Sequence, residues 1–343
     1  MLSVESLFAN RPDLQSDWRL AEKILTPYDQ AGVGGCYYKR EDAYAPLGFG
    51  GVNGSKVRQA TWYFDYLLRL YPDADGFVFG GSIRSPLHVR VAAIARHFGK
   101  KSLNLFGATN ANVAWKHDIV QQVEFLGAEL DFGSKVAYNN ALSKRAAQLA
   151  QERNYLRVPY GLWLGPEHLS EPLLRHFHGL AGWQVSNWPE HIKRVILPAG
   201  TCTTAVSVFN GILVEAERTR GLREVVLPVI GTDHTQWFWE RAAYLQRMSL
   251  PDLHALLGQR SLEVKFYHDK RMCDWSDEAK GVQIGDLYMH PAYEAKIVRW
   301  IRQEKLDWLD DPQTCFWLVG GHAQLQPMIE WETKHGHRSR ALV

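Results

Sequence analysis

The chain has 343 residues, of which 46% are apolar and 22% are charged, and its formal net charge is +2. This length suits one or two closely packed domains, and the nearly balanced charge gives no electrostatic sign of nucleic-acid binding. No apolar run approaches the roughly eighteen residues of a membrane span, so we expect no membrane association. The thirteen tryptophans predict large anchors in a core or a subunit interface, and hence a homodimer.

Short apolar strand patterns alternate with longer helical patterns along the chain. The predicted strands, rich in β-branched or aromatic residues, cover 76–79, 102–106, 194–197, 225–230, 262–267 and 316–319. The predicted helices carry apolar stripes at helical spacing and cover 56–70, 86–97, 113–126, 141–152, 204–217 and 291–303. This alternation predicts an α/β fold with parallel sheets, in which ligands bind at the carboxyl ends of strands.

The first loop of interest is GFGGVNGSKVRQA, residues 48–60, where four glycines precede a lysine at the start of a predicted helix. We expect Ser55 to be the N-cap of this helix and Lys56 its first residue. A helix N-terminus favours negative charge, so a cation is poorly placed there. Lys56 is therefore either a solvated surface lysine or an amine whose neutral form is needed, and the surrounding glycines favour the second interpretation.

Two further loops follow predicted strands. PAGTCTTA, residues 198–205, places small and hydroxyl side chains at a strand-to-helix turn, which is typical of either a simple helix start or a single phosphate site. It lacks the Gly-Lys-Ser/Thr ending of a Walker loop. In the other loop, Ser85 is a natural N-cap and Pro86 a natural first helical residue, which taken alone is a structural feature.

Taken together and in this order, KREDAYAPLGFGGVNGSKVRQA and GGSIRSPLHVRVAAIARHFGKK resemble the pyridoxal 5'-phosphate (PLP) enzymes of fold type II, the tryptophan synthase β-like group. The subgroup that they resemble is that of 1-aminocyclopropane-1-carboxylate deaminase and D-cysteine desulfhydrase. Further matches are PAGTCTTA, LYMHPAYEAKIVRWI and LVGGHAQLQ, so the resemblance covers about 38–325.

This resemblance implies two mostly parallel open sheets flanked by helices, with PLP between two domains. The expected large domain comprises 1–55 and 165–343, and the small domain comprises 56–164. The implied activity is that of a lyase or deaminase that acts on an amino-acid-like substrate through an internal aldimine and a quinonoid. A helix start and desolvation both favour a neutral lysine, which suits a Schiff-base amine.

The resemblance also implies roles for individual residues. Lys56 carries the cofactor as a Schiff base and then acts as acid and base. Ser85 binds the substrate carboxylate or acts near its α-carbon, and Tyr293 is either core packing or a catalytic phenol. Glu294 is either an exposed acid early in a helix or the carboxylate that keeps the pyridine nitrogen protonated. The implied phosphate-binding residues are Gly200, Thr201, Cys202, Thr203 and Thr204.

Several positions depart from the family pattern. Pro86 replaces an asparagine that contacts the cofactor, Ser82 replaces a glycine, and Gly54-Ser55 is a two-residue insertion before the lysine. These changes predict a retained cofactor with a rebuilt substrate pocket.

One alternative is a PLP enzyme that decarboxylates, or eliminates from, an amino acid attached to a nucleotide or DNA; Pro86, Arg84, Arg90 and the basic C-terminal tail point weakly to it. Another is a non-catalytic binding protein.

The four widely spaced cysteines and the polar N-terminus predict reduced thiols and a cytoplasmic location. The histidine clusters, such as His335 to Arg340, show no convincing metal-ligand spacing, so we expect no metal site.

Overall fold

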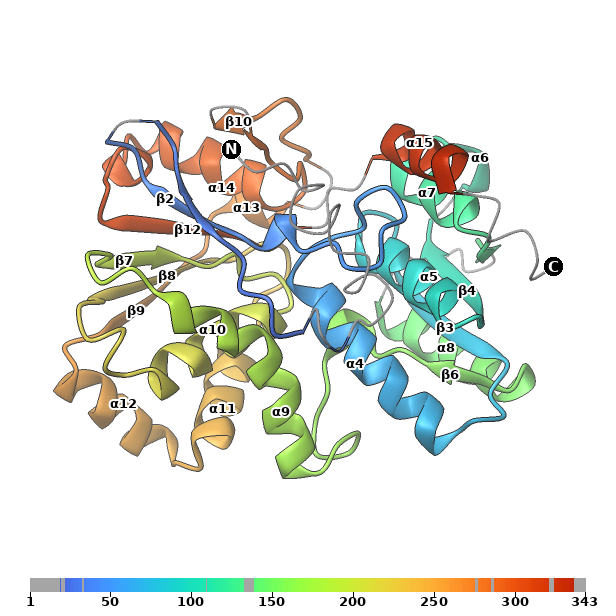
Figure 1. Ribbon diagram of the computed structural model, residues 1–343, viewed down its shortest axis with the longest axis horizontal. Helices are drawn as coiled ribbons and strands as arrows, with labels where there is room; N and C mark the ends of the chain where they lie inside the picture. The colour runs from blue at the N-terminus through green and yellow to red at the C-terminus, as the bar shows by residue number, and fades with distance from the viewer. Residues whose placement is uncertain are drawn as a thin grey trace. The chain divides into compact units, whose positions relative to one another are not determined.

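The computed structural model describes residues 19, 22–32, 34–108, 110–132, 139–274, 277–284, 287–320 and 324–335. The chain divides into two compact units (Figure 1). The first unit contains Lys23–Ala43 and Gly165–Gly320, and the second contains Tyr44–Leu164 together with the segments Leu2–Glu22 and Gly321–Val343. The division predicted from the sequence, at 55/56 and 164/165, stays a prediction.

The first unit is built on a six-stranded sheet with the order β1-β2-β12-β7-β8-β9. Only β1 is antiparallel to its neighbour. The strands are β1 (Tyr28–Gln30), β2 (Tyr37–Arg40), β7 (Arg194–Ile196), β8 (Glu224–Pro228), β9 (Glu263–Tyr267) and β12 (Thr314–Leu318). The short strands β10 (Gln283–Ile284) and β11 (Leu287–Tyr288) form a separate antiparallel pair.

Helices cover both faces of this sheet. Alternate residues of a strand point to opposite faces, so neighbouring strand residues pack against different helices. Val195 and Trp317 pack in one core cluster with residues of α10 (Thr203–Val214), α11 (Thr235–Gln246) and α12 (Leu250–Gln259). Ile196 and Phe316 pack in the other cluster with residues of α13 (Lys270–Cys273) and α14 (Glu294–Gln303). Helix α9 (Glu171–Gly182) packs closely on α10, where a Cβ at Gly211 would lie 2.2 Å from the carbonyl oxygen of Gly182.

The second unit is built on a four-stranded parallel sheet with the order β5-β4-β3-β6. Its strands are β3 (Gly76–Ser82), β4 (Lys101–Gly107), β5 (Glu129–Asp131) and β6 (Tyr155–Arg157). Helix α8 (Asn139–Glu152) packs against one face, where Leu142 meets Val78 and Leu103. On the other face lie α4 (Ser55–Leu70) and α5 (Leu87–His97), and the rings of Phe64 and Phe77 stack with 4.0 Å between centroids.

The predicted α/β class with mostly parallel sheets is confirmed, and all six predicted strands are present. The helix predicted over 113–126 is wrong in extent, because it is two helices, α6 (Ala111–Ala114) and α7 (Asp118–Phe125). Between them His117 adopts an extended backbone with ψ 130°, and its carbonyl oxygen accepts the first hydrogen bonds of α7. The C-terminal helix α15 (Leu325–His335) was not predicted. Within the described residues, no helix combines the length and apolarity needed to cross a membrane.

Candidate active site

Lys56 lies at the start of α4, but the predicted cap is wrong. The helix begins at Ser55, and its N-cap is Gly54 with φ 106°, a backbone angle that residues with a Cβ rarely adopt. Ser55 is already helical, and among the described residues its buried Oγ atom has no hydrogen-bond partner. Helix α4 has no side-chain cap within the described chain and no acidic residue in its first turn. Its positive end is thus left uncompensated directly at the lysine.

Two hydrogen bonds hold the backbone of the loop before Lys56, and both come from residues of the same unit. The Gly54 N–H donates to the carbonyl oxygen of Tyr44 over 3.0 Å. Arg90 of α5, which is 4% exposed, donates from Nε to the carbonyl oxygen of Asn53 over 3.0 Å. Arg90 is therefore buried and positions the lysine loop.

Two of the loop glycines make room for α15. A Cβ at Gly50 would lie 2.2 Å from the Cα of Met328, and one at Gly48 would lie 3.0 Å from the ring of Trp331. A Cβ at Gly51 would have no such neighbouring atom within 4 Å. Gly48 and Gly50 therefore serve the packing of the C-terminal helix.

Ser85 lies in the turn between β3 and α5. Its N–H donates to the carbonyl oxygen of Ser82 over 2.8 Å, and its own carbonyl oxygen accepts from the N–H of His88 over 3.2 Å. The helix begins at Leu87 with Pro86 as its N-cap, so the predicted cap at Ser85 and first helical residue at Pro86 are wrong by one residue. The half-buried Ser85 side chain consequently lies just before a helix N-terminus, where an anion is favoured.

The PAGTCTTA turn has the form of an anion site. Helix α10 begins at Thr203, and its N-cap Cys202 has φ 58°, a left-handed conformation that is strained for a residue other than glycine. Within the described chain this helix has no side-chain cap, and no acid stands in its first turn. The first N–H groups of any α-helix lack intrahelical partners, so α10 directs donors and its positive end at the turn that contains Gly200 and Thr201.

A buried polar network supports the first turn of α10, and the sequence analysis missed it. Ser207 Oγ–H donates to the carbonyl oxygen of Thr203 over 2.7 Å, and His178 Nδ1 lies 2.7 Å from the same Oγ. Because the serine proton is used, Nδ1–H of His178 is the donor to Oγ. Burial lowers the pKa of His178 to about 3, so the ring is neutral. The signal in the sequence is the His176-Phe177-His178 run, and its pattern does not by itself point to this network.

Glu294 is the first residue of α14 and is 2% exposed. Its Oε1 atom accepts a hydrogen bond from the N–H of Val319 over 2.9 Å, whereas Oε2 is buried without a partner among the described residues. The pKa of Glu294 is raised to about 7, mainly by burial and to a lesser degree by the nearby Asp42 carboxylate, against backbone hydrogen bonds that lower it. The prediction of an exposed acid is therefore wrong. A buried carboxyl group with an unused oxygen is suited to accept a hydrogen bond from a protonated pyridine nitrogen.

Tyr293 and Gly200 lie close together in the first unit. A Cβ at Gly200 would lie 3.1 Å from Cε1 of Tyr293, so this glycine lets the ring approach the PAGTCTTA turn. The structure thus brings Tyr293 to the PAGTCTTA turn, with Glu294 next in the chain. Lys56 and Ser85 belong to the second unit.

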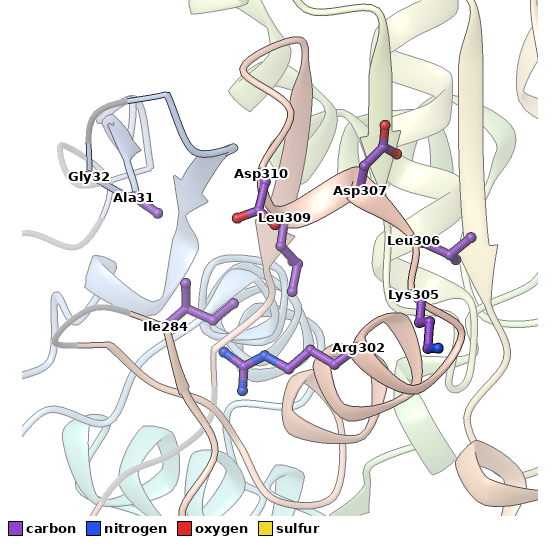
Figure 2. A pocket seen from close by; sticks show the side chains of 9 residues that line it. All are labelled: Ala31, Gly32, Ile284, Arg302, Lys305, Leu306, Asp307, Leu309 and Asp310. Atoms are coloured by element: carbon purple, nitrogen blue, oxygen red, sulfur yellow. The ribbon is translucent and has the colours of Figure 1, made fainter.

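A pocket of about 640 Å³ in the first unit is separate from these residues. Figure 2 shows Ile284 and Leu309 in this pocket, with the guanidinium of Arg302 and the carboxylate of Asp310 near them. Arg302 is near the C-terminal end of α14, whereas Glu294 begins that helix, and ten helical residues span about 15 Å. Among the described residues, no group of three or more His, Cys, Asp or Glu side chains could hold a metal ion.

These features fit a single cofactor class. The anion-binding turn suits a phosphate, the unused Oε2 of Glu294 suits a protonated ring nitrogen, and an uncompensated helix start suits a neutral lysine amine.

Known structures share the fold over almost the whole chain: an ACC deaminase homologue (TM-score 0.63, 16% identity, 93% of this chain and 94% of the other) and Escherichia coli diaminopropionate ammonia lyase (TM-score 0.56, 16% identity, 94% and 92%). Threonine deaminase isoform 2 of Solanum lycopersicum shares it as well (TM-score 0.55, 13% identity, 97% and 94%). The chain is a PLP-dependent enzyme of fold type II.

The sequence places the chain more narrowly. It is 30% identical to the O-seryl-dTMP PLP-dependent decarboxylase of Salmonella phage ViI over 345 aligned positions, which cover 85% of this chain and 79% of the relative. The chain belongs to the family of that enzyme. No protein-family model matches the sequence.

Proposed function

We propose that the protein is a PLP-dependent decarboxylase of an amino acid that is joined through its side chain to a nucleotide. The similarity to the phage ViI decarboxylase over most of the chain carries this proposal. A seryl group can lose CO₂ by PLP chemistry only if its carboxylate and its amine are both unmodified, which leaves the serine oxygen as the point of attachment. The Cα–carboxylate bond then breaks, CO₂ leaves, and a proton takes its place on Cα, so that an O-linked aminoethyl group remains.

Each proposed role rests on the local chemistry of one residue. PLP, when bound, draws electrons from the bonds of the substrate α-carbon. Lys56 Nζ holds the cofactor and returns the proton to Cα, because its place at an uncompensated helix start favours the neutral amine that can exchange protons. The N–H groups of the turn at 200–204 hold the phosphate, and Glu294 Oε2 accepts from the pyridine N–H.

Ser85 and Pro86 bear on the choice of the bond that breaks. The Ser85 hydroxyl is the proposed contact to the substrate carboxylate. Pro86 offers neither an N–H nor a polar side chain, so it supplies no hydrogen bond of its own to the substrate carboxylate. A carboxylate with fewer hydrogen bonds is less stabilised as an anion and more readily leaves as neutral CO₂, which supports decarboxylation.

The test is the product of the PLP-loaded enzyme acting on synthetic O-seryl thymidine monophosphate and, separately, on free serine. We expect the nucleotide to lose one CO₂, as measured by mass spectrometry, and to keep its amine. Release of ammonia and a keto acid, with no decarboxylated nucleotide, would contradict the proposal.

A second candidate is deamination of a free amino acid. The buried Glu294 favours it, because the resemblance associates glutamate at this position with the deaminase branch. The same assay separates the two functions, since deamination of free serine releases ammonia without CO₂. The predicted homodimer and cytoplasmic location stay predictions.

A further inference from the structure

A column of aromatic rings crosses the second unit from its core to its surface. The His88 and Phe106 rings stack with 4.1 Å between centroids, and Phe106 stacks on Phe132 at 5.6 Å. Trp115 then packs at 54° on Phe132, with 5.5 Å between centroids. His88 and Phe106 are fully buried, whereas Trp115 is 38% exposed. The column therefore ends in a tryptophan with part of its surface in solvent.

This tryptophan lies at the carboxyl end of the four-stranded sheet. Phe106 is near the end of β4, Trp115 directly follows α6, and Phe132 directly follows β5. The neighbouring strand β3 ends at Ser82, in the turn that carries Ser85. Parallel α/β sheets bind ligands at this end. Trp115 and the proposed substrate-binding serine are thus carried by loops of the same ligand-binding edge.

Contacts of His88 hold the buried end of the column in place. His88 Nδ1 lies 2.9 Å from Asn104 Oδ1, and burial lowers the pKa of His88 to about 4, so that its ring is neutral at physiological pH. A Cβ at Gly81 would lie 3.4 Å from His88 Nε2, which places the histidine directly under the end of β3. A ring supported in this way loses little freedom when a ligand stacks on it, and this preorganisation favours binding.

The residue after Trp115 adds a charge. Lys116 is exposed, and it follows the tryptophan directly in the chain. A loop that carries both an exposed aromatic ring and a cation suits a nucleotide, because every base has a face that stacks on tryptophan and every nucleotide carries a phosphate. A free amino acid such as serine has no flat group that could use the indole.

We propose that Trp115 is the base-stacking residue and Lys116 the phosphate contact for a nucleotide-linked substrate. The proposal rests on the function proposed above and adds to it a subsite in the second unit. The amino-acid part of the substrate reaches the PLP chemistry, while Trp115 holds the base and so distinguishes the nucleotide-linked amino acid from the free one.

The test is binding of thymidine monophosphate alone to the PLP-loaded protein, measured by isothermal titration calorimetry. Trp115→Ala should weaken binding by about 5- to 100-fold, and Trp115→Phe, which keeps an aromatic face, should retain most of the affinity. Lys116→Ala should weaken binding of the monophosphate but not of thymidine. The matched control is Trp183→Ala, which removes a 50% exposed tryptophan of the first unit and should leave binding unchanged.

The outcomes separate this subsite from the proposed function. If Trp115→Ala binds the nucleotide as the wild type does while the wild type decarboxylates the seryl nucleotide, the Trp115 assignment is wrong and the function stands. If the wild type neither binds the nucleotide nor converts the seryl nucleotide, the proposed function is wrong, and the subsite fails with it.

Discussion

Helices α4 and α10 begin in the same way, but a lysine stands at the start of α4, whereas we propose that an anion binds at the start of α10. In the described chain neither has a side-chain cap, neither has an acid in its first turn, and each is preceded by a residue with positive φ, Gly54 or Cys202. At α10 the positive end meets neutral hydroxyl residues and can hold an anion. At α4 it meets Lys56, where we propose that it favours a neutral amine. One physical device, an uncompensated helix N-terminus, thus suits phosphate binding in one unit and a reactive amine in the other.

The two helix starts also differ in how they are held. The loop before α4 combines hydrogen bonds at Asn53 and Gly54 with close packing of Gly50 against the backbone of Met328. The turn before α10 is supported by the His178–Ser207–Thr203 hydrogen bonds. Packing is sensitive to added volume, whereas a hydrogen-bond network is sensitive to the loss of a donor. The following predictions test this difference, beginning with the residue that gives α4 its proposed role.

Lys56→Ala should have the largest effect. It removes the proposed cofactor amine, so the visible absorbance band of lysine-bound PLP should disappear and turnover should fall by about 10²- to 10⁴-fold. Absorbance spectra of the purified protein and single-turnover kinetics measure the two effects. Lys305→Ala, a change at an exposed lysine of the first unit, is the control and should alter neither. A Lys56→Ala protein that kept the band would refute the assignment.

Gly50→Ala should destabilise the loop before α4 strongly. The new Cβ would meet Met328 in a backbone with φ 67°, and we expect a loss of about 3 kcal/mol in the free energy of unfolding. Gly51→Ala shares the positive φ of 88° but meets no atom within 4 Å, so it should cost only about 1 kcal/mol. Chemical denaturation of both variants isolates the packing contribution. Equal losses would show that α15 does not constrain the loop.

Glu294→Gln should change how the stability of PLP-free protein depends on pH. The pKa of Glu294 is raised from 4.5 to about 7, so the folded state binds a proton that the unfolded state releases between these values. Wild-type stability should therefore fall as pH rises from 4.5 to 7, by up to about 3 kcal/mol from this group. Glutamine cannot ionise, so the variant should lose this fall. Denaturation curves across this range measure it, and parallel curves for both proteins would contradict the prediction.

His178→Leu should weaken PLP binding by about 5- to 10-fold, because Ser207 loses its donor and the first turn of α10 is less well fixed. His178→Asn also removes the ring, but it keeps an N–H close to the position of Nδ1, and its affinity should stay closer to that of the wild type. Fluorescence titration with PLP, alongside melting temperatures, separates binding from stability. The network has no role in the phosphate turn if both variants bind PLP equally well while their melting temperatures fall.

The sequence by itself determined the α/β class and the six predicted strands, and it singled out the loops at Lys56, Ser85 and PAGTCTTA, but it did not predict α9, α11, α12 or α15. Local patterns were sufficient for this, because strand and helix periodicity and the turn residues near Lys56, Ser85 and Thr203 are properties of neighbouring residues. The family resemblance added the cofactor. Even at this level, the caps at Ser55 and Ser85 were misplaced by one residue, since the φ of Gly54 and the position of Pro86 decided where each helix begins.

Only the tertiary structure decided which residues support the site. The contact of Gly50 with Met328 joins positions 278 residues apart in the chain, and no local pattern reveals it. The packing of the helices likewise decides that His178 contacts Ser207 and that the buried Arg90 donates to Asn53. It also leaves one carboxylate oxygen of Glu294 without a partner among the described residues. Burial sets whether a charged group is solvated, paired or shifted in pKa, and it arises from contacts between segments that are distant in sequence.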